Sequence, residues 1–349
     1  MKKIGVGVLG ATGAVGQRFI DLLEDHPWFY VKFVFASEKN EGKKYKDAVI
    51  WKVSAKVPKS VSLLPILKCD PKSSPVKIVF SALDSTVAGE IEENFARKGC
   101  IVVSNSKNHR NDKYVPLLVP EVNPEHLGLI ELQKNDLKSK GFIVTNPNCT
   151  TVGLSMVLKP LNDAFGVKKA IVTTMQALSG AGYPGVSSMD SLDNVVPFIG
   201  GEEEKVEKEP LKILGTLSKK GIVLSKISID AHCNRVTVRD GHLETLTIEF
   251  DKKPSMVEVL SVLKNFKALP QKLKLPSAPL SPIVPREEDD RPQPVLDRNE
   301  GNGMSVVVGR IRKSNIFDIR LSLLVHNTIR GAAGCAILNA ELLYKKNYL

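Results

Sequence analysis

Long apolar runs, paired cysteines and aromatic side chains are all scarce in this sequence. No stretch approaches the roughly 18 consecutive apolar residues of a membrane-spanning helix, so we expect no membrane partner. The five cysteines are scattered and odd in number, and none forms a Cys-x-x-Cys pair. This pattern argues against a disulfide framework and a zinc site, and it predicts a reducing, cytoplasmic location without a bound metal.

A basic stripe is also missing, although the chain is basic overall. Lys and Arg total 49 against 38 Asp and Glu, which gives a formal net charge of +11. The basic residues are interspersed with the acidic ones, and aromatics make up only 6% of the chain. We therefore predict a solvated surface of mixed charge and no nucleic-acid partner. The surplus positive charge can still attract a small anionic ligand.

The beginning of the chain has the pattern of a dinucleotide-binding fold. A strand-like run at residues 3–9 leads into a glycine turn at 10–16, a helical pattern at 17–24 and a second strand-like run at 31–36. Glycines in such a turn let the backbone approach a pyrophosphate at the helix N-terminus. The alternative is a glycine turn that serves packing alone. We predict cofactor binding by Gly10, Thr12, Gly13, Ala14 and Val15.

The later pattern predicts two different sheets, and 349 residues suffice for two domains. Strand-like runs at 76–81, 101–104 and 142–145, with a helical stretch at 87–98, predict a Rossmann-type α/β domain with a parallel sheet. After residue 148 the pattern predicts a mixed or antiparallel sheet with one covered face. Proline-rich and charged residues 276–304 are expected to form a surface excursion. The strands expected in the second sheet are 169–176, 236–239, 245–250, 305–311 and 319–326.

One cysteine stands where a reactive thiol is expected. Cys149 follows the apolar run 141–144 and precedes a helical pattern at 152–158. The positive end of the helix dipole favours the thiolate, which is the nucleophilic form. The alternative is a small buried core cysteine, the common situation of a free cysteine.

Other candidate residues lie at predicted strand ends. Gln176 ends a strand ahead of a loop dense in small residues. Arg235 and His242 lie seven residues apart, so they share a face only if the turn at 240–241 interrupts the strand. After the second strand, Ser37 with the nearby Lys39 fits a ribose 2′-phosphate and favours NADP, while the intervening Glu38 keeps NAD possible.

A series of motifs runs along the chain in a fixed order: GATGAVG at 10–16, NPNCT at 146–150, Q at 176, SGAG at 179–182, EEEK at 202–205, R at 235, GH at 241–242, N at 327 and RGAAG at 330–334. This ordered set resembles the aspartate-β-semialdehyde dehydrogenases, in particular their archaeal and fungal branch. The resemblance implies a dinucleotide-binding domain at 1–148, completed by a C-terminal helix at 328–349. It also implies an α+β catalytic and oligomerisation domain of the glyceraldehyde-3-phosphate-dehydrogenase-like type at 149–327, in a homodimer or homotetramer.

The resemblance also implies roles for single residues. Cys149 matches the nucleophile, His242 the acid/base and Gln176 the residue that orients the acyl intermediate. The substrate α-carboxylate would bind Arg235 and its amino group Glu202. Phosphate-handling positions match Lys205, Asn108 and Arg110, and further cofactor positions match Ser37, Ser81, Ala82, Ser179, Gly180 and Asn327, the last as a contact to the nicotinamide carboxamide.

The implied reaction is the NADP-dependent reductive dephosphorylation of L-aspartyl 4-phosphate to L-aspartate 4-semialdehyde through a cysteine thioester. Such a step serves lysine, diaminopimelate, threonine and methionine biosynthesis, with a small-molecule substrate and phosphate as partners. A CoA-thioester reductase, such as a malonyl-CoA reductase, is the nearest alternative, and N-acetylglutamyl-phosphate reductase is a more distant one. His326, where many members carry an acidic residue, is a departure from the pattern. A cofactor-sensing binding protein would be expected to lack Cys149 or His242, and both are present.

Overall fold

Two compact units make up the chain in the computed structural model, which describes residues 3–73 and 75–349. Unit 1 comprises Met1–Leu118, Glu125–Asn146 and Ala332–Leu349, and unit 2 comprises Val119–Pro124 and Pro147–Gly331. The chain therefore returns to unit 1 after completing unit 2.

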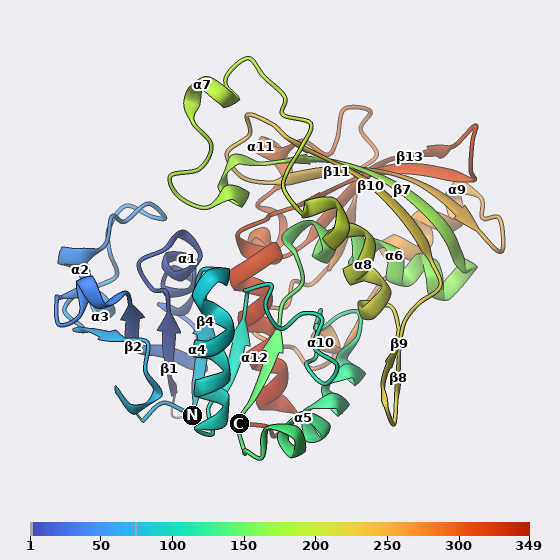
Figure 1. The fold of residues 1–349 in the computed structure, drawn as a ribbon. Helices are drawn as coiled ribbons and strands as arrows, with labels where there is room; N and C mark the ends of the chain where they lie inside the picture. The colour runs from blue at the N-terminus through green and yellow to red at the C-terminus, as the bar shows by residue number, and fades with distance from the viewer. Residues whose placement is uncertain (1–2, 74) are drawn as a thin grey trace. The chain divides into compact units, whose positions relative to one another are not determined.

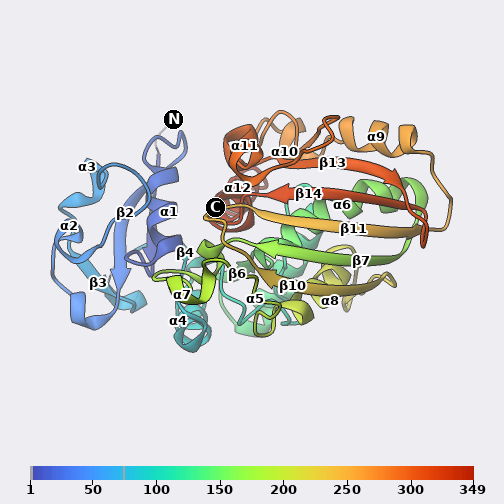
Figure 2. The same cartoon turned by 90° about the horizontal axis from the view of Figure 1, so that it is seen from above.

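Unit 1 is built on a parallel sheet with the strand order β3-β2-β1-β4-β5-β6 (Figure 1). Helices α1 and α12 contact each other on one side of the sheet, while α4 and α5 contact β6 on the other (Figure 2). This strand order and layering confirm the predicted Rossmann-type fold. The elements are β1 (Ile4–Leu9), α1 (Ala14–Leu23), β2 (Phe29–Ala36), α2 (Tyr45–Ala48), α3 (Lys59–Ser62), β3 (Ile66–Lys68), β4 (Ile78–Ser81), α4 (Ser85–Arg97), β5 (Ile101–Ser104), α5 (Leu129–Leu137), β6 (Phe142–Thr145) and α12 (Gly334–Lys345).

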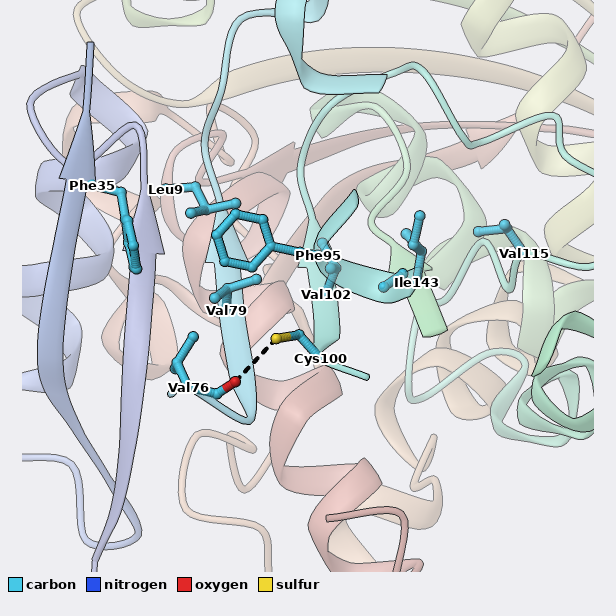
Figure 3. Close-up of a cluster of buried hydrophobic side chains, with 10 residues drawn as sticks. Leu9, Phe35, Val76, Val79, Phe95, Cys100, Val102, Val115 and Ile143 are labelled. Carbon is cyan, nitrogen blue, oxygen red and sulfur yellow. Dashed lines mark hydrogen bonds between the residues drawn. The ribbon is translucent and has the colours of Figure 1, made fainter. Parts of the chain in front are cut away.

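The core of unit 1 forms because β4, β5 and β6 are apolar up to their last residues, Ser81, Ser104 and Thr145. Every residue of these short strands is buried, as expected for a parallel sheet covered on both faces. Figure 3 shows Phe95 of α4 lying among Leu9, Phe35 and Val79. Cys100 belongs to this cluster: its thiol donates to the carbonyl of Val76 over 3.0 Å, and burial raises its pKa. It is a structural cysteine.

Unit 2 contains a mixed sheet with the order β10-β7-β11-β14-β13-β12 (Figure 2). Helices α6, α8 and α9 all pack against one face of it (Figure 1). In β11 the buried side chains alternate along the strand, so the predicted mixed sheet with one covered face is confirmed. The elements are α6 (Cys149–Phe165), β7 (Val167–Gln176), α7 (Ser188–Ser191), α8 (Glu202–Ile213), β8 (Thr216–Ser218), β9 (Gly221–Val223), β10 (Ser228–Arg235), β11 (His242–Phe250), α9 (Met256–Lys264), α10 (Leu269–Lys272), β12 (Ile283–Pro285), α11 (Pro294–Asp297), β13 (Val306–Lys313) and β14 (Ile319–Val325).

Two local predictions for unit 2 are wrong. The strand expected at 236–239 is an irregular connection, and the preceding residues form β10 instead. The β-branched residues of 236–239 fit a strand locally, but their backbone bonds the turn after β7: Leu178 and Ser179 donate to the carbonyls of Val238 and Arg239. The expected surface excursion 276–304 contributes the edge strand β12, where a proline is tolerated.

None of the helices in the described residues is long and apolar enough to cross a membrane. Over residues 3–73 and 75–349, no group of three or more His, Cys, Asp or Glu side chains is placed to hold a metal ion.

Candidate active site

Cys149 is the first residue of α6, a position that the residue before it creates. The side-chain oxygen of Asn148 accepts hydrogen bonds from the backbone N–H groups of Thr150 and Thr151, at 3.0 and 3.4 Å. This cap starts the helix directly at the cysteine. As the first residue of the helix, Cys149 lies at the positive end of the α6 dipole. Because it is only partly buried, a ligand can reach it.

The strand register of the mixed sheet brings three predicted site residues into one row. Arg235, the last residue of β10, pairs with Gln176, the last residue of β7. On the other side of β7, Leu243 pairs with Met175, so His242 at the start of β11 lies level with Gln176. All three side chains of this row are buried on the helix-covered face. As expected, the chain leaves the strand between Arg235 and His242: β10 ends at the first and β11 begins at the second.

His242 contacts the cysteine directly. Its Nε2 lies 3.1 Å from Sγ of Cys149, and its Nδ1 accepts a hydrogen bond of 3.0 Å from the backbone N–H of Ala177. Burial, followed by the electrostatic effect of the neighbouring Arg235 and His326, lowers the pKa of His242 to about 3. Burial and these neighbours therefore favour the neutral imidazole.

Arg235 is a buried cation without a counter-ion in the described part of the chain. The residue is 7% exposed, and its Nη1 donates to the carbonyl of Ala177 over 2.6 Å. Burial lowers its pKa, which means that the unpaired charge is costly. Because a planar guanidinium binds a carboxylate with two hydrogen bonds, an anionic ligand is the natural partner.

Helix α8 supplies two buried carboxylates to the residue before Cys149. The side-chain amide of Asn148 donates to Oε1 of Glu202, while Oε2 of Glu202 lies 2.6 Å from Nζ of Lys205. The backbone N–H of Asn148 donates to Glu209 over 2.6 Å. Sequence reasoning missed Glu209. The signal was its spacing of seven from Glu202, which places both on one face of a helix.

The other two glutamates of the EEEK motif point elsewhere. Glu203 accepts a hydrogen bond from the backbone N–H of Cys233 on the edge strand β10, at 3.1 Å. Glu204 is exposed and lies 3.8 Å from Lys208. Of the three glutamates, only Glu202 bonds Asn148, the N-cap of α6. The structure therefore distinguishes Glu202 from Glu203 and Glu204, which the sequence alone could not.

The loop after β7 needs small residues because two side chains approach it closely. A Cβ on Gly180 would lie 2.9 Å from Nη1 of Arg235 and 3.1 Å from Cε1 of His242. Ser179 accepts a hydrogen bond of 2.8 Å from the amide of Asn327, whose oxygen binds the N–H of Gly241. Asn327 therefore ties this loop to the turn before His242.

A buried ion pair holds the segment that packs on Cys149. The two terminal guanidinium nitrogens of Arg330 bind the carboxylate of Glu121, at 2.9 and 2.5 Å, and both side chains are buried. The next residue, Gly331, lies so close to Cys149 that an added Cβ would be 2.7 Å from the cysteine Cβ. Segment 119–124 of unit 2 thus supports the cysteine through Arg330 and Gly331.

Unit 1 carries the glycine turn in the form that a dinucleotide requires. Gly10 has φ +72°, and an added Cβ would lie 2.6 Å from the carbonyl oxygen of Ala82. On Gly16 a Cβ would collide with the carbonyl of Gly10. Gly13 is the N-cap of α1 and is more open; no side chain caps this end and no acidic residue lies in the first turn. Such an N-terminus suits a pyrophosphate.

The remaining predicted residues of unit 1 lie at the carboxyl ends of neighbouring strands. Ser37 follows β2 and is exposed, while Ser81 ends β4 and is buried. After β5, Asn108 bonds the carbonyl of Ser85 over 2.9 Å, and Nη2 of Arg110 bonds the carbonyl of Asn105 over 2.9 Å.

The structure thus sorts the predicted residues into two sets. Within unit 2, the Cys149–His242 contact, the row with Arg235 and Gln176, and the Asn148–Glu202–Lys205 chain form one connected cluster. Ser179, Gly180 and Asn327 adjoin this cluster through Arg235 and His242. The other set lies in unit 1, at and after the carboxyl ends of its parallel strands: Gly10, Thr12, Gly13, Ala14, Val15, Ser37, Ser81, Ala82, Asn108 and Arg110.

Comparison with known families identifies the class first. Residues 5–130 match the semialdehyde dehydrogenase NAD-binding domain, and residues 158–330 match the semialdehyde dehydrogenase dimerisation domain. The parallel sheet of unit 1 and the mixed sheet of unit 2 agree with that class.

Individual relatives narrow the class. The aspartate-semialdehyde dehydrogenase of Archaeoglobus fulgidus is 51% identical over 99% of this chain and 100% of its own, and that of Schizosaccharomyces pombe is 51% identical over 99% of both. A crystal structure of aspartate-semialdehyde dehydrogenase with NADP from Candida albicans superimposes with a TM-score of 0.91 at 43% identity, covering 100% of both chains. The chain belongs to the aspartate-semialdehyde dehydrogenase family, and the predicted archaeal and fungal resemblance is confirmed.

Proposed function

We propose that this chain is an NADP-dependent enzyme that converts L-aspartyl 4-phosphate to L-aspartate 4-semialdehyde through a thioester on Cys149. The observation that carries the proposal is the 3.1 Å contact between Sγ of Cys149 and His242 at the N-terminus of α6. A sulfur in that position is a nucleophile rather than a core residue. The names of the relatives support the substrate.

The charges of unit 2 match the groups of the substrate. The unpaired guanidinium of Arg235 suits the α-carboxylate. Glu202 suits the amino group, although its oxygens already bind Asn148 and Lys205, so the substrate would join an existing network. Lys205 in unit 2, with Arg110 and Asn108 in unit 1, is assigned to phosphate. Gln176, which donates to the hydroxyl of Thr174 over 3.3 Å, is assigned to orienting the acyl group.

In the reaction, Sγ of Cys149 attacks the acyl carbon and phosphate leaves, which creates a thioester. NADPH, when bound, supplies the hydride that reduces this thioester. His242 lies where it can act on the oxygen of the resulting thiohemiacetal, and the sulfur is then expelled as the semialdehyde forms.

The cofactor is assigned to the turn and strand ends of unit 1. The close approach at Gly10 and Gly16 and the uncapped start of α1 fit a pyrophosphate. Ser37 and Lys39 are both exposed after β2, which favours a ribose 2′-phosphate and hence NADP over NAD. Asn327 is assigned to the nicotinamide carboxamide, and Ser81, Ala82, Ser179 and Gly180 are assigned to other contacts with the cofactor.

We also infer a homo-oligomer in a biosynthetic setting. The matched dimerisation domain spans residues 158–330. Within it, a segment after β7 exposes large apolar side chains at Tyr183, Met189, Leu192, Val195 and Phe198. Exposed apolar groups in one segment mark an interaction surface. The product would serve lysine, diaminopimelate, threonine and methionine biosynthesis, and the predicted cytoplasmic location stays a prediction.

The decisive experiment follows absorbance at the reduced-nicotinamide band. The protein is mixed with NADP, aspartate semialdehyde and phosphate, then with phosphate omitted, and Cys149→Ala is run beside both. Cys69→Ala is the matched control, because burial raises the pKa of that thiol to about 11. Phosphate-dependent reduction that is lost only in Cys149→Ala supports the proposal. Inactivity, with oxidation of NADPH by malonyl-CoA instead, would assign the chain to the CoA-thioester reductases.

A further inference from the structure

The backbone N–H of Asn148 is a buried donor that helix α6 cannot use. Asn148 is the N-cap of α6, directly before Cys149, and it is 6% exposed. Backbone N–H groups at the start of a helix have no partner within the helix. Because a buried N–H without an acceptor is costly, this donor needs an acceptor from another element.

Helix α8 supplies that acceptor through Glu209. Oε2 of Glu209 accepts from the backbone N–H of Asn148 over 2.6 Å, the short distance expected of a hydrogen bond to an ionised group. Glu209 is 5% exposed, and its helix packs against α6 and β10. Seven residues earlier on α8, Glu202 accepts from the side-chain amide of Asn148. Two carboxylates of one helix thus hold Asn148 at its backbone and at its side chain.

The backbone of Asn148 leads directly into the reactive residue. Sγ of Cys149 lies 3.1 Å from Nε2 of His242, the first residue of β11. A Cβ added to Gly331 would lie 2.7 Å from the Cβ of Cys149. Cys149 therefore contacts two separate segments of unit 2. A displacement of its backbone would change the distance to His242 or press on Gly331.

The charge of Glu209 argues for holding the cysteine in place and against activating it. A negative charge beside a thiol disfavours the thiolate, so Glu209 cannot promote the ionisation of Cys149 through its charge. The positive end of α6 nevertheless favours a carboxylate at this place. What Glu209 contributes is an acceptor oxygen at a fixed position.

Another glutamate of α8 makes the same kind of bond away from the cysteine. Glu207 accepts from the backbone N–H of Ala231 over 3.2 Å, on the edge strand β10. That bond joins a helix to a strand and does not involve the residue before Cys149. Glu207 is therefore a matched control for Glu209 on the same helix.

We propose that Glu209 is a positioning residue for the nucleophile: its carboxylate oxygen fixes the backbone of Asn148 and thereby holds Sγ of Cys149 against His242. The inference rests on the proposed function and adds a residue to it. The acid/base role stays with His242. Glu209 acts through Asn148 and needs no contact with the substrate.

Three substitutions of Glu209 separate the acceptor oxygen from the charge. Glu209→Gln keeps an oxygen at the same reach and removes the charge. Glu209→Met has the length of glutamine and no charge, but it has no oxygen to accept the N–H. Glu209→Asp keeps the charge and withdraws it by one methylene group. Circular dichroism checks the fold of each variant, and Glu209→Asp makes the test if Glu209→Met does not fold. Glu207→Met is the control.

The first readout is kcat and KM with NADP, aspartate semialdehyde and phosphate. Glu209→Met and Glu209→Asp should each lose about tenfold or more in kcat relative to Glu209→Gln, because a lost hydrogen bond misplaces the nucleophile. KM for the semialdehyde should stay within about twofold. Glu207→Met should match the wild type. Equal kcat for the glutamine and methionine variants, or a rise in KM with kcat unchanged, would overturn the proposal.

The second readout needs no substrate. Alkylation of Cys149 by iodoacetamide, followed by mass spectrometry of its peptide, reports the reactivity of the resting thiol. Glu209→Met should react several-fold more slowly than Glu209→Gln, because a loosened cap moves the sulfur away from the positive end of α6. Equal alkylation rates would also overturn the proposal. Inactivity of the wild type toward aspartate semialdehyde, with this difference in alkylation present, would contradict the proposed function alone.

Discussion

The variant Glu244→Gln should become more stable than the wild type as the pH rises, because Glu244 is a carboxylic acid buried without a hydrogen-bond partner. It lies on the covered face of β11, paired across the sheet with Thr174 and Leu323, and it is 0% exposed. Both carboxyl oxygens are buried and have no hydrogen-bond partner in the described structure. Burial therefore raises the pKa of Glu244 well above its ordinary value.

The sign of the effect follows from proton binding. Below about pH 4.3, the ordinary pKa of a glutamate, both the folded and unfolded states hold the proton and the carboxyl has no effect on stability. As the pH rises, only the unfolded state releases it, so the folded state loses about 1.4 kcal/mol per pH unit until its own raised pKa is reached. Glutamine has nearly the same shape and cannot ionise, so Glu244→Gln does not suffer this loss.

The assay is urea unfolding followed by circular dichroism, with both proteins in the same buffers at about pH 5 and pH 6. The difference in unfolding free energy should grow by about 1.4 kcal/mol between them in favour of the variant. Glu249→Gln, on the same strand, is the matched control, since a hydrogen bond from Lys169 lowers the pKa of Glu249. Its stability difference from wild type should be constant over this range. Parallel curves for Glu244→Gln would refute the reasoning.

Three further outcomes are expected. Gly331→Ala places a Cβ 2.7 Å from that of Cys149, so kcat should fall about 100-fold in steady-state assays while circular dichroism is unchanged; wild-type kcat would contradict the close contact. Arg330→Met leaves Glu121 buried and unpaired, which should cost about 3–5 kcal/mol in urea unfolding, and adding Glu121→Leu should recover most of it. Ser37→Asp should lower the ratio of kcat/KM for NADP to that for NAD at least about tenfold by repelling a 2′-phosphate, and an unchanged ratio would place that phosphate elsewhere.

The sequence predicted the elements whose signals are local. The run before Gly10 and the glycine spacing after it identify β1, the turn and α1, because a strand that feeds a helix through so tight a turn needs those glycines. Cys149 was similarly readable, since Asn148 caps the helix that begins at the cysteine.

What the sequence missed depends on partners distant in the chain. Strand β10 contains several polar residues and lies at the edge of the sheet. Glutamates of α8 bond its free edge: Glu207 and Glu203 accept from the backbone N–H groups of Ala231 and Cys233. No hydrophobic pattern reports such a strand. The placement of His242 is another example, because its Nδ1 accepts a hydrogen bond from the backbone N–H of Ala177, a residue 65 positions away with no chemical signature of its own.

The membership of α12 in unit 1 affects the order in which the chain can fold during synthesis. All six parallel strands leave the ribosome before Ala332–Leu349, and most of unit 2 is made in between. Until α12 emerges, Asn146 lacks its 2.7 Å bond from Asn339, and His26 lacks its 2.8 Å contact with Glu341. A chain synthesised as far as Gly331 contains all residues of unit 2 but not all those of unit 1. Unit 1 holds the N-terminus, yet its sequence is completed last, so it cannot fold to completion ahead of unit 2 in the usual N-terminal-first order.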